Sequence, residues 1–200
     1  GGGGEPSCHR DLEEILRFTK ANGLESSLVS NGYALKPGCI DAIVTCCTWA
    51  RISLDADGPE IYEKTHGMRN DAFSRVVKSI EQIAKTKQQY KNDFTFGVTY
   101  LIGPHTLAGM YNAAKLVKNL GADYIRFRPF FDWQADDLDL NASAMDEMSR
   151  CEELRCETFD VSYPENRMVA RIGGQKQERK YEKCEIHHFS TLVDTDQKVY

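Results

Sequence analysis

Residues 49–102 decide the fold and read WARISLDADGPEIYEKTHGMRNDAFSRVVKSIEQIAKTKQQYKNDFTFGVTYLI. The two ends of this stretch, Trp49–Asp55 and Phe94–Ile102, have the length and apolar content of strands. Between them, apolar residues recur every three or four positions, which places them on one face of a helix: Phe73, Val76, Val77, Ile80, Ile83 and Ala84. A strand, a helix and a second strand predict parallel pairing through a right-handed crossover.

The same alternation continues on both sides of this unit. Upstream, Ser7 is predicted to cap a helix that carries Leu12, Ile15 and Leu16. A strand at 24–30 and a helix at 37–46 follow, with a proline tolerated in the first helical turn. Downstream, Thr106 is predicted to cap a helix that leads to a strand at 122–130. A helix at 144–154 and a strand at 155–161 extend the pattern, which predicts an α/β fold with a parallel sheet.

Composition narrows the class of protein. The 200 residues carry 25 basic and 30 acidic side chains, a net charge of −5 that argues against a nucleic-acid partner. No apolar run approaches the roughly 20 residues that a membrane helix needs, so no membrane partner is expected. The seven cysteines are odd in number and scattered, and no leader is recognisable. These features predict reduced thiols and a cytoplasmic protein.

Ligands of parallel α/β folds bind at the carboxyl ends of the strands. The candidate positions are therefore the residues just after each predicted strand, including His66 and His105 in the following segments. Arg126 and Arg128 alternate with apolar residues along the strand at 122–130. In a barrel one alternating set faces inward, so these arginines are predicted either to meet an anion of the substrate or cofactor, or to form surface salt bridges.

An ordered set of short motifs resembles the radical S-adenosylmethionine (radical SAM) superfamily. Gly2-Gly3-Gly4-Glu5-Pro6 is similar to the GGEP motif that ends the second barrel strand of that family. Ser30-Asn31-Gly32 resembles the end of its third strand, and Arg51-Ile52-Ser53-Leu54-Asp55-Ala56 resembles its fourth. Ile61–Gly67 looks like the segment that often follows. The resemblance covers residues 2–130 and implies a partial TIM-like barrel of the (β/α)6 type.

The resemblance also implies which residues contact S-adenosylmethionine (SAM). The Glu5 carboxylate would accept charge-assisted hydrogen bonds from the cationic amino group of the methionine part. Ser53 and Asp55 would bind the ribose hydroxyls, or Ser53 the methionine carboxylate, and the backbone of Leu101 and Ile102 would face adenine. The remaining implied cofactor residues are Gly2, Gly3, Gly4, Ser30, Asn31 and Arg128. In the family's GxIxGxxE strand pattern, Thr99 and Thr106 replace the first glycine and the last glutamate.

The cysteine loop that defines this family is not found in the sequence. Three thiolates spaced CxxxCxxC hold a [4Fe–4S] cluster, and no cysteine here precedes Cys8. We therefore expect an internal fragment whose parent enzyme uses SAM and a [4Fe–4S] cluster to make a 5′-deoxyadenosyl radical. That radical would abstract hydrogen from an unidentified small-molecule or peptide substrate. The chain alone is expected to be inactive, to bind neither cofactor, and to self-associate through exposed barrel edges.

Two domains are predicted, a truncated barrel at residues 1–165 and a linker with the start of a C-terminal extension at 166–200. Cys184 and the segment Val193–Tyr200 resemble the start of a SPASM-type auxiliary cluster domain. Two other functions stay open. One is a non-radical TIM-barrel lyase or aldolase that uses Glu5 or Asp55 as a general base. The other is a non-catalytic relative that binds a nucleotide or a protein.

Overall fold

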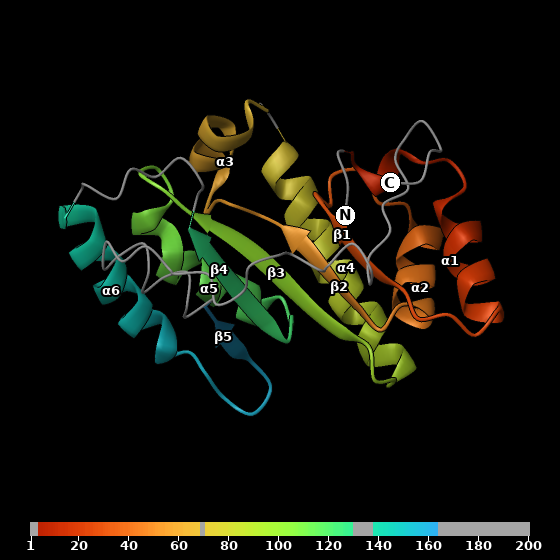
Figure 1. Cartoon of the computed structure of the whole chain (residues 1–200). Coiled ribbons are helices and arrows are strands. Elements are labelled where there is room, and N and C mark those ends of the chain that lie inside the picture. The colour runs from red at the N-terminus through yellow and green to blue at the C-terminus, as the bar shows by residue number, and fades with distance from the viewer. Residues whose placement is uncertain (1–3, 69–70, 130–137, 164–200) are drawn as a thin grey trace, which may run out of the picture.

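A parallel five-stranded sheet forms the centre of the molecule (Figure 1). The computed structural model describes residues 4–68, 71–129 and 138–163. The strands lie in chain order and all pair in parallel: β1 (Ser27–Ser30), β2 (Trp49–Ser53), β3 (Thr95–Ile102), β4 (Tyr124–Pro129) and β5 (Asp160–Ser162). The predicted α/β class and the parallel sheet are therefore confirmed. Gly2, Gly3 and the predicted extension at 166–200 lie outside the described residues.

Helices connect the strands of the sheet. The predicted bounds of the helix at 37–46 are confirmed, and the other predicted helices differ mainly at their ends. Their bounds are α1 (Leu12–Ala21), α2 (Pro37–Cys46), α3 (Pro59–His66), α4 (Ala72–Tyr90), α5 (Met110–Asn119) and α6 (Leu138–Glu152), with short 3₁₀ turns η1 (Pro6–Cys8) and η2 (Leu107–Gly109). In the view of Figure 1, α4 and α5 lie behind the sheet, whereas α3 lies above it. None of these helices is long and apolar enough to cross a membrane.

The two faces of the sheet differ in chemistry because side chains alternate along each strand. One face is fully buried against the helices and holds Ile52, Phe96, Val98, Tyr100, Ile102, Ile125 and Phe127. The opposite face carries Trp49, Arg51, Ser53, Gly97, Thr99, Leu101, Tyr124, Arg126 and Arg128, most of them partly buried. This second set is called the arginine face below.

A close approach between β3 and β4 depends on a glycine. Gly97 pairs with Tyr124 in the sheet register. A Cβ atom on Gly97 would lie 2.2 Å from Cζ of the Tyr124 ring and 2.4 Å from one Cε. The tyrosine ring therefore lies directly over the backbone of β3, on the arginine face, and only glycine leaves room for it.

The start of the chain differs from the prediction. Ser7 does not cap a long helix, because it lies within η1, and Glu5 occupies the cap position of that turn. Helix α1 begins only at Leu12, after Asp11. Of the three apolar residues predicted along this helix, Ile15 is 46% exposed, whereas Leu12 and Leu16 are buried. The helix thus buries a narrower apolar stripe than the sequence pattern predicts.

Candidate functional site

The Glu5 carboxylate joins the N-terminal segment to the end of β1. Its Oε1 accepts hydrogen bonds from the Ser30 hydroxyl at 2.6 Å and from the Ser7 N–H at 2.9 Å. Its Oε2 accepts from the Asn31 N–H at 2.7 Å. Burial raises the pKa of Glu5, but these hydrogen bonds outweigh it and hold the pKa below its usual value. Glu5 is therefore charged at neutral pH, and a carboxylate can accept about four hydrogen bonds, which leaves capacity for one more.

The turn after β1 is fixed by its own polar side chains. The Ser30 hydroxyl also accepts from the Gly32 N–H at 3.0 Å, and Asn31 Oδ1 accepts from the Tyr33 N–H at 2.9 Å. Gly32 has a φ of 72° and packs closely on Ile52, whose Cγ2 would lie 2.8 Å from a Cβ at this position. The segment Ser30-Asn31-Gly32 therefore holds the Glu5 carboxylate in one place at the sheet edge.

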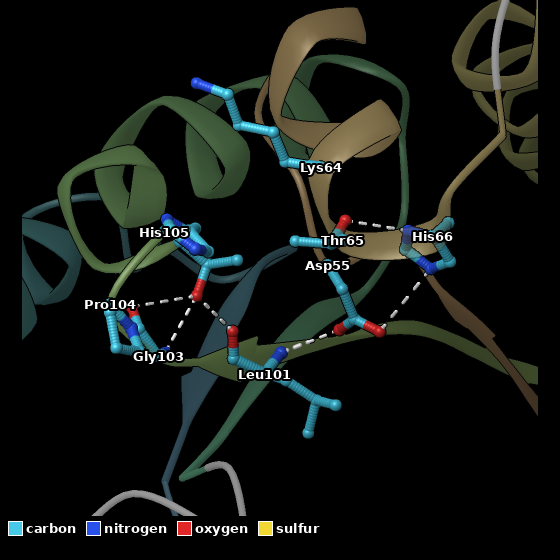
Figure 2. A pocket seen from close by; sticks show the side chains of 9 residues that line it. Asp55, Lys64, Thr65, His66, Leu101, Gly103, Pro104 and His105 are labelled. Carbon is cyan, nitrogen blue, oxygen red and sulfur yellow. Dashed lines mark hydrogen bonds and ion pairs between the residues drawn. The ribbon is translucent and has the colours of Figure 1, made fainter.

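Asp55 lies just past the end of β2 and is almost fully buried, with 9% of its surface exposed. Its backbone has a φ of 48°, a left-handed conformation that aspartate tolerates better than most residues. Oδ1 accepts from the Leu101 N–H of β3 at 2.7 Å (Figure 2). Burial raises the pKa of the Asp55 carboxyl to about 6, and the hydrogen bond from Leu101 opposes this rise. The group therefore titrates near physiological pH.

His66, the last residue of α3, faces the other oxygen of Asp55. Its Nε2 is 4.0 Å from Asp55 Oδ2, and its Nδ1 is 2.8 Å from the Thr65 hydroxyl. The imidazole stacks on the Tyr62 ring with 4.1 Å between the ring centroids. Burial lowers the pKa of His66, so the imidazole is neutral at pH 7 and does not neutralise Asp55.

The loop after β3 is closed by Thr106. Its hydroxyl accepts from the Gly103 N–H at 2.8 Å and lies 2.6 Å from the Leu101 carbonyl oxygen, to which it donates. The prediction that Thr106 caps the next helix with its side chain is wrong, because it makes no capping bond to η2. The backbone of Leu101 was also predicted to contact adenine, but both of its polar groups already have partners within the protein. Its N–H is already bonded to Asp55, and its carbonyl already accepts from Thr106.

A pocket of about 270 Å³ opens between α3 and the loops that follow β2 and β3 (Figure 2). This volume is just below the roughly 300 Å³ at which pockets for drug-sized ligands begin, so it would take part of such a ligand. The pocket is lined by Asp55, Lys64, Thr65, His66, Leu101, Gly103, Pro104, His105 and Thr106. The Lys64 side chain points away from Asp55 in Figure 2.

The predicted site residues are partly brought together. Glu5, Ser30 and Asn31 form one cluster, and Asp55 and Leu101 line the pocket. The Ile102 side chain is fully buried on the helix side of the sheet, so only its backbone is near the site. The other predicted residues are placed as follows: Gly4 is exposed before η1, Ser53 ends β2 on the arginine face, and Arg128 lies near the end of β4 on that face.

Lys64 and Thr65 line the pocket but were not singled out as site residues from the sequence, whereas Pro104 lies in the segment after a predicted strand. The histidines His66 and His105 were flagged only by their place after predicted strands. The missing signal is tertiary, since α3 contributes its last turn to a pocket whose other wall is the loop after β3. Among the side chains of residues 4–68, 71–129 and 143–163, no group of three histidine, cysteine or acidic side chains is placed to hold a metal ion.

Replacing Thr106 by valine is expected to lower the free energy of unfolding by about 2 kcal/mol, because the buried Gly103 N–H loses its acceptor. Urea denaturation measures the change. Thr19→Val on α1 removes a hydroxyl that bonds only to the Ile15 carbonyl within its own helix, and it serves as the control. Equal effects of the two variants would contradict the role given to Thr106.

The sequence of this chain matches a known protein family and is similar to known proteins. Residues 1–121 match the radical SAM superfamily. An AdoMet-dependent heme synthase of Methanosarcina barkeri is 30% identical over 131 residues, which make up 64% of this chain and 35% of the synthase. A probable GTP 3′,8-cyclase of Saccharolobus solfataricus is 38% identical over 80 residues, 40% of this chain and 25% of the cyclase.

A solved structure shares the fold. The crystal structure of Streptococcus suis SuiB bound to S-adenosylmethionine superposes with a TM-score of 0.64 at 13% identity, covering 92% of this chain and 41% of SuiB. The parallel sheet is thus that of a partial (β/α) barrel. The chain spans about a third or less of the length of the two relatives named above, so it corresponds to one portion of such proteins.

Proposed function

The chain belongs to the radical SAM superfamily, and we propose that it supplies the SAM-binding edge of an enzyme of that superfamily. One observation carries this proposal. A charged Glu5 at the end of β1 and a buried Asp55 beside a pocket at the ends of β2 and β3 lie along the same edge of one parallel sheet. This is the edge at which ligands of such sheets bind.

The residues along this edge fit the parts of SAM in order. The remaining acceptor capacity of Glu5 suits the cationic amino group of the methionine part. Asp55 Oδ2, which is not used by Leu101, suits a ribose hydroxyl, and the pocket next to it suits adenine. Neighbouring strands are about 4.8 Å apart, so the ends of β1 and β3 are separated by about 10 Å. An extended molecule of the size of SAM would span that distance.

The ligands of the [4Fe–4S] cluster are not among the described residues, which contain no set of thiolates or other side chains that would hold it. We propose that its ligands belong to parts of the parent protein outside the described residues. When SAM and a reduced [4Fe–4S] cluster are bound, they supply reductive cleavage of SAM and hydrogen abstraction. This chain's own residues hold and orient the cofactor, with Glu5 accepting the amino group and Asp55 a hydroxyl. The substrate, a small molecule or a peptide, would approach from the same edge.

Glu5→Gln is expected to weaken SAM binding by the natural gene product at least tenfold. A neutral amide accepts weaker hydrogen bonds than a carboxylate, and its NH₂ group would face the N–H or hydroxyl donors that now bind the carboxylate. Equilibrium dialysis with labelled SAM measures the affinity. Glu14→Gln on the exposed surface of α1 is the matched control. Unchanged affinity in Glu5→Gln would exclude Glu5 from the cofactor site.

A second function is favoured by the pKa of Asp55. A carboxyl with a pKa of about 6 beside a neutral imidazole has the character of a general base. A lyase or aldolase acting on a carbonyl substrate would use it without SAM. Turnover of such a substrate by the SAM-free protein, abolished in Asp55→Asn, would support this alternative over the first.

A further inference from the structure

Two arginines of the arginine face lie close together in the sheet register. Arg51 on β2 is opposite Gly97 on β3, and Gly97 is opposite Tyr124 on β4. Arg126 lies two residues beyond Tyr124, opposite Thr99. The strands that carry Arg51 and Arg126 are two spacings, or about 10 Å, apart. Because arginine side chains are long and both lie on the same face, their guanidinium groups can approach the space over β3 together.

These two arginines have no anionic partner in the part of the chain that the structure describes. The Nε nitrogen of each is fully buried and has no hydrogen-bond acceptor there. The carboxylate of Asp160, which β4 places in the same row as Tyr124, is paired with Arg155 at 3.0 Å. The Arg51 guanidinium stacks on the Trp49 ring, with its central carbon 4.4 Å from the ring centroid. Stacking uses the flat side of the guanidinium and leaves its N–H donors, which lie in its plane, available.

Tyr124 lies in the same row of the sheet as Arg51 and two residues before Arg126 on β4. Its ring lies over Gly97, because a Cβ there would be 2.2 to 2.5 Å from three ring carbons. Burial raises the pKa of the Tyr124 phenol, and the positive charges of Arg51 and Arg126 oppose this rise, as expected when both lie near the hydroxyl. Two guanidinium groups and a phenol, all hydrogen-bond donors, thus share the arginine face in neighbouring rows of the sheet.

We propose that Arg51, Arg126 and the Tyr124 hydroxyl form a subsite for an anionic group of the substrate, either a carboxylate or a phosphate. A buried N–H donor without an acceptor is costly, as at the Nε of each arginine, and an arginine fork matches both of these anions. The subsite lies below the edge proposed for SAM, since Arg51 comes two residues before the end of β2 and Arg126 three before the end of β4. This inference rests on the proposed function, and it restricts the substrate to an anionic small molecule or peptide.

The test follows the arginine Nε–H signals of the ¹⁵N-labelled 200-residue chain by NMR. Arg51→Lys and Arg126→Lys assign the two signals by their loss. The probes are inorganic phosphate and succinate, with neutral succinamide and chloride at matched ionic strength as controls. We expect phosphate or succinate to shift both Nε–H signals in a saturable way. The ratio of the affinity for phosphate to that for succinate then shows whether the subsite prefers a phosphate or a carboxylate. Tyr124→Phe, which keeps the ring but removes the donor, should weaken binding several-fold.

Three results would overturn the inference. The first is the absence of a shift at Arg51 and Arg126. The second is an equal shift of the highly exposed Arg10, which would indicate nonspecific screening. The third is that SAM shifts the same two Nε–H signals to saturation and competes with succinate for this site, which would assign the subsite to the cofactor. SAM binding is measured separately, by dialysis with the natural gene product. Anion binding by the chain, together with no SAM binding by that gene product, would contradict the proposed function alone.

Discussion

Gly97→Ala is expected to lower the free energy of unfolding by about 3 kcal/mol, at the upper end of the usual range for overpacking. The new methyl group would lie 2.2 Å from the Tyr124 ring, a rigid ring carried by the residue that pairs with Gly97 in the sheet. Either the ring must leave its place or β3 and β4 must separate. Urea denaturation followed by circular dichroism measures the change.

Two further variants show whether the effect comes from this contact. Gly58→Ala is the control, because a Cβ at Gly58 meets nothing within 4 Å. It should cost less than about 1 kcal/mol, as expected for a helix cap position. In a Tyr124→Ala background, Gly97→Ala should lose most of its effect, because residues in contact are coupled. A full effect in that background would show that another contact requires the glycine.

Asp55→Asn is expected to stabilise the protein by about 3 kcal/mol near pH 8 and to have little effect near pH 4. The folded-state pKa of about 6 lies above the ordinary value of 3.8. The protonated carboxyl therefore contributes stability that is fully present below about 3.8 and is lost as the pH rises through about 6. Each pKa unit corresponds to about 1.4 kcal/mol, which gives the size of the effect. Asparagine keeps the acceptor for the Leu101 N–H and removes the buried charge.

Unfolding at the two pH values measures this difference. Asp93→Asn on the exposed surface is the control, and it should change stability by less than about 0.5 kcal/mol at either pH. A destabilised Asp55→Asn near pH 8 would mean that the charge is already compensated in the folded protein. If Asp55→Asn stabilises the protein and also weakens SAM binding, the result would be typical of a functional site. In such a site, a group is held in a state that lowers stability but serves the function.

Much of the fold follows from local patterns in the sequence. The helix at 37–46 begins at a proline, and the strands at 49–53 and 95–102 are short apolar runs, so their positions are set by residues close in sequence. The polar residues after the strands were therefore placed correctly at one edge of the sheet. That edge holds Glu5, Ser30, Asn31 and Asp55.

The hydrogen bonds of the site could not be predicted in the same way. Thr106 was expected to cap a helix, but its hydroxyl bonds to Leu101 and Gly103 because the loop folds back on β3. Asp55 bonds to Leu101, 46 residues later, through strand pairing that no local pattern specifies. Ile102 follows Leu101 by one residue and so faces the helices instead of the site. The face of the sheet on which a side chain lies depends on the register of strand pairing, and this register is set by tertiary packing.

The most direct test of the central proposal is SAM cleavage by the natural gene product that contains this chain. The protein would be purified anaerobically, reconstituted with iron and sulfide, and reduced with dithionite in the presence of SAM. The proposal predicts that 5′-deoxyadenosine and methionine form, and that Glu5→Gln lowers their formation while Glu14→Gln does not. A protein that carries a reduced cluster and binds SAM, yet forms no 5′-deoxyadenosine, would contradict it.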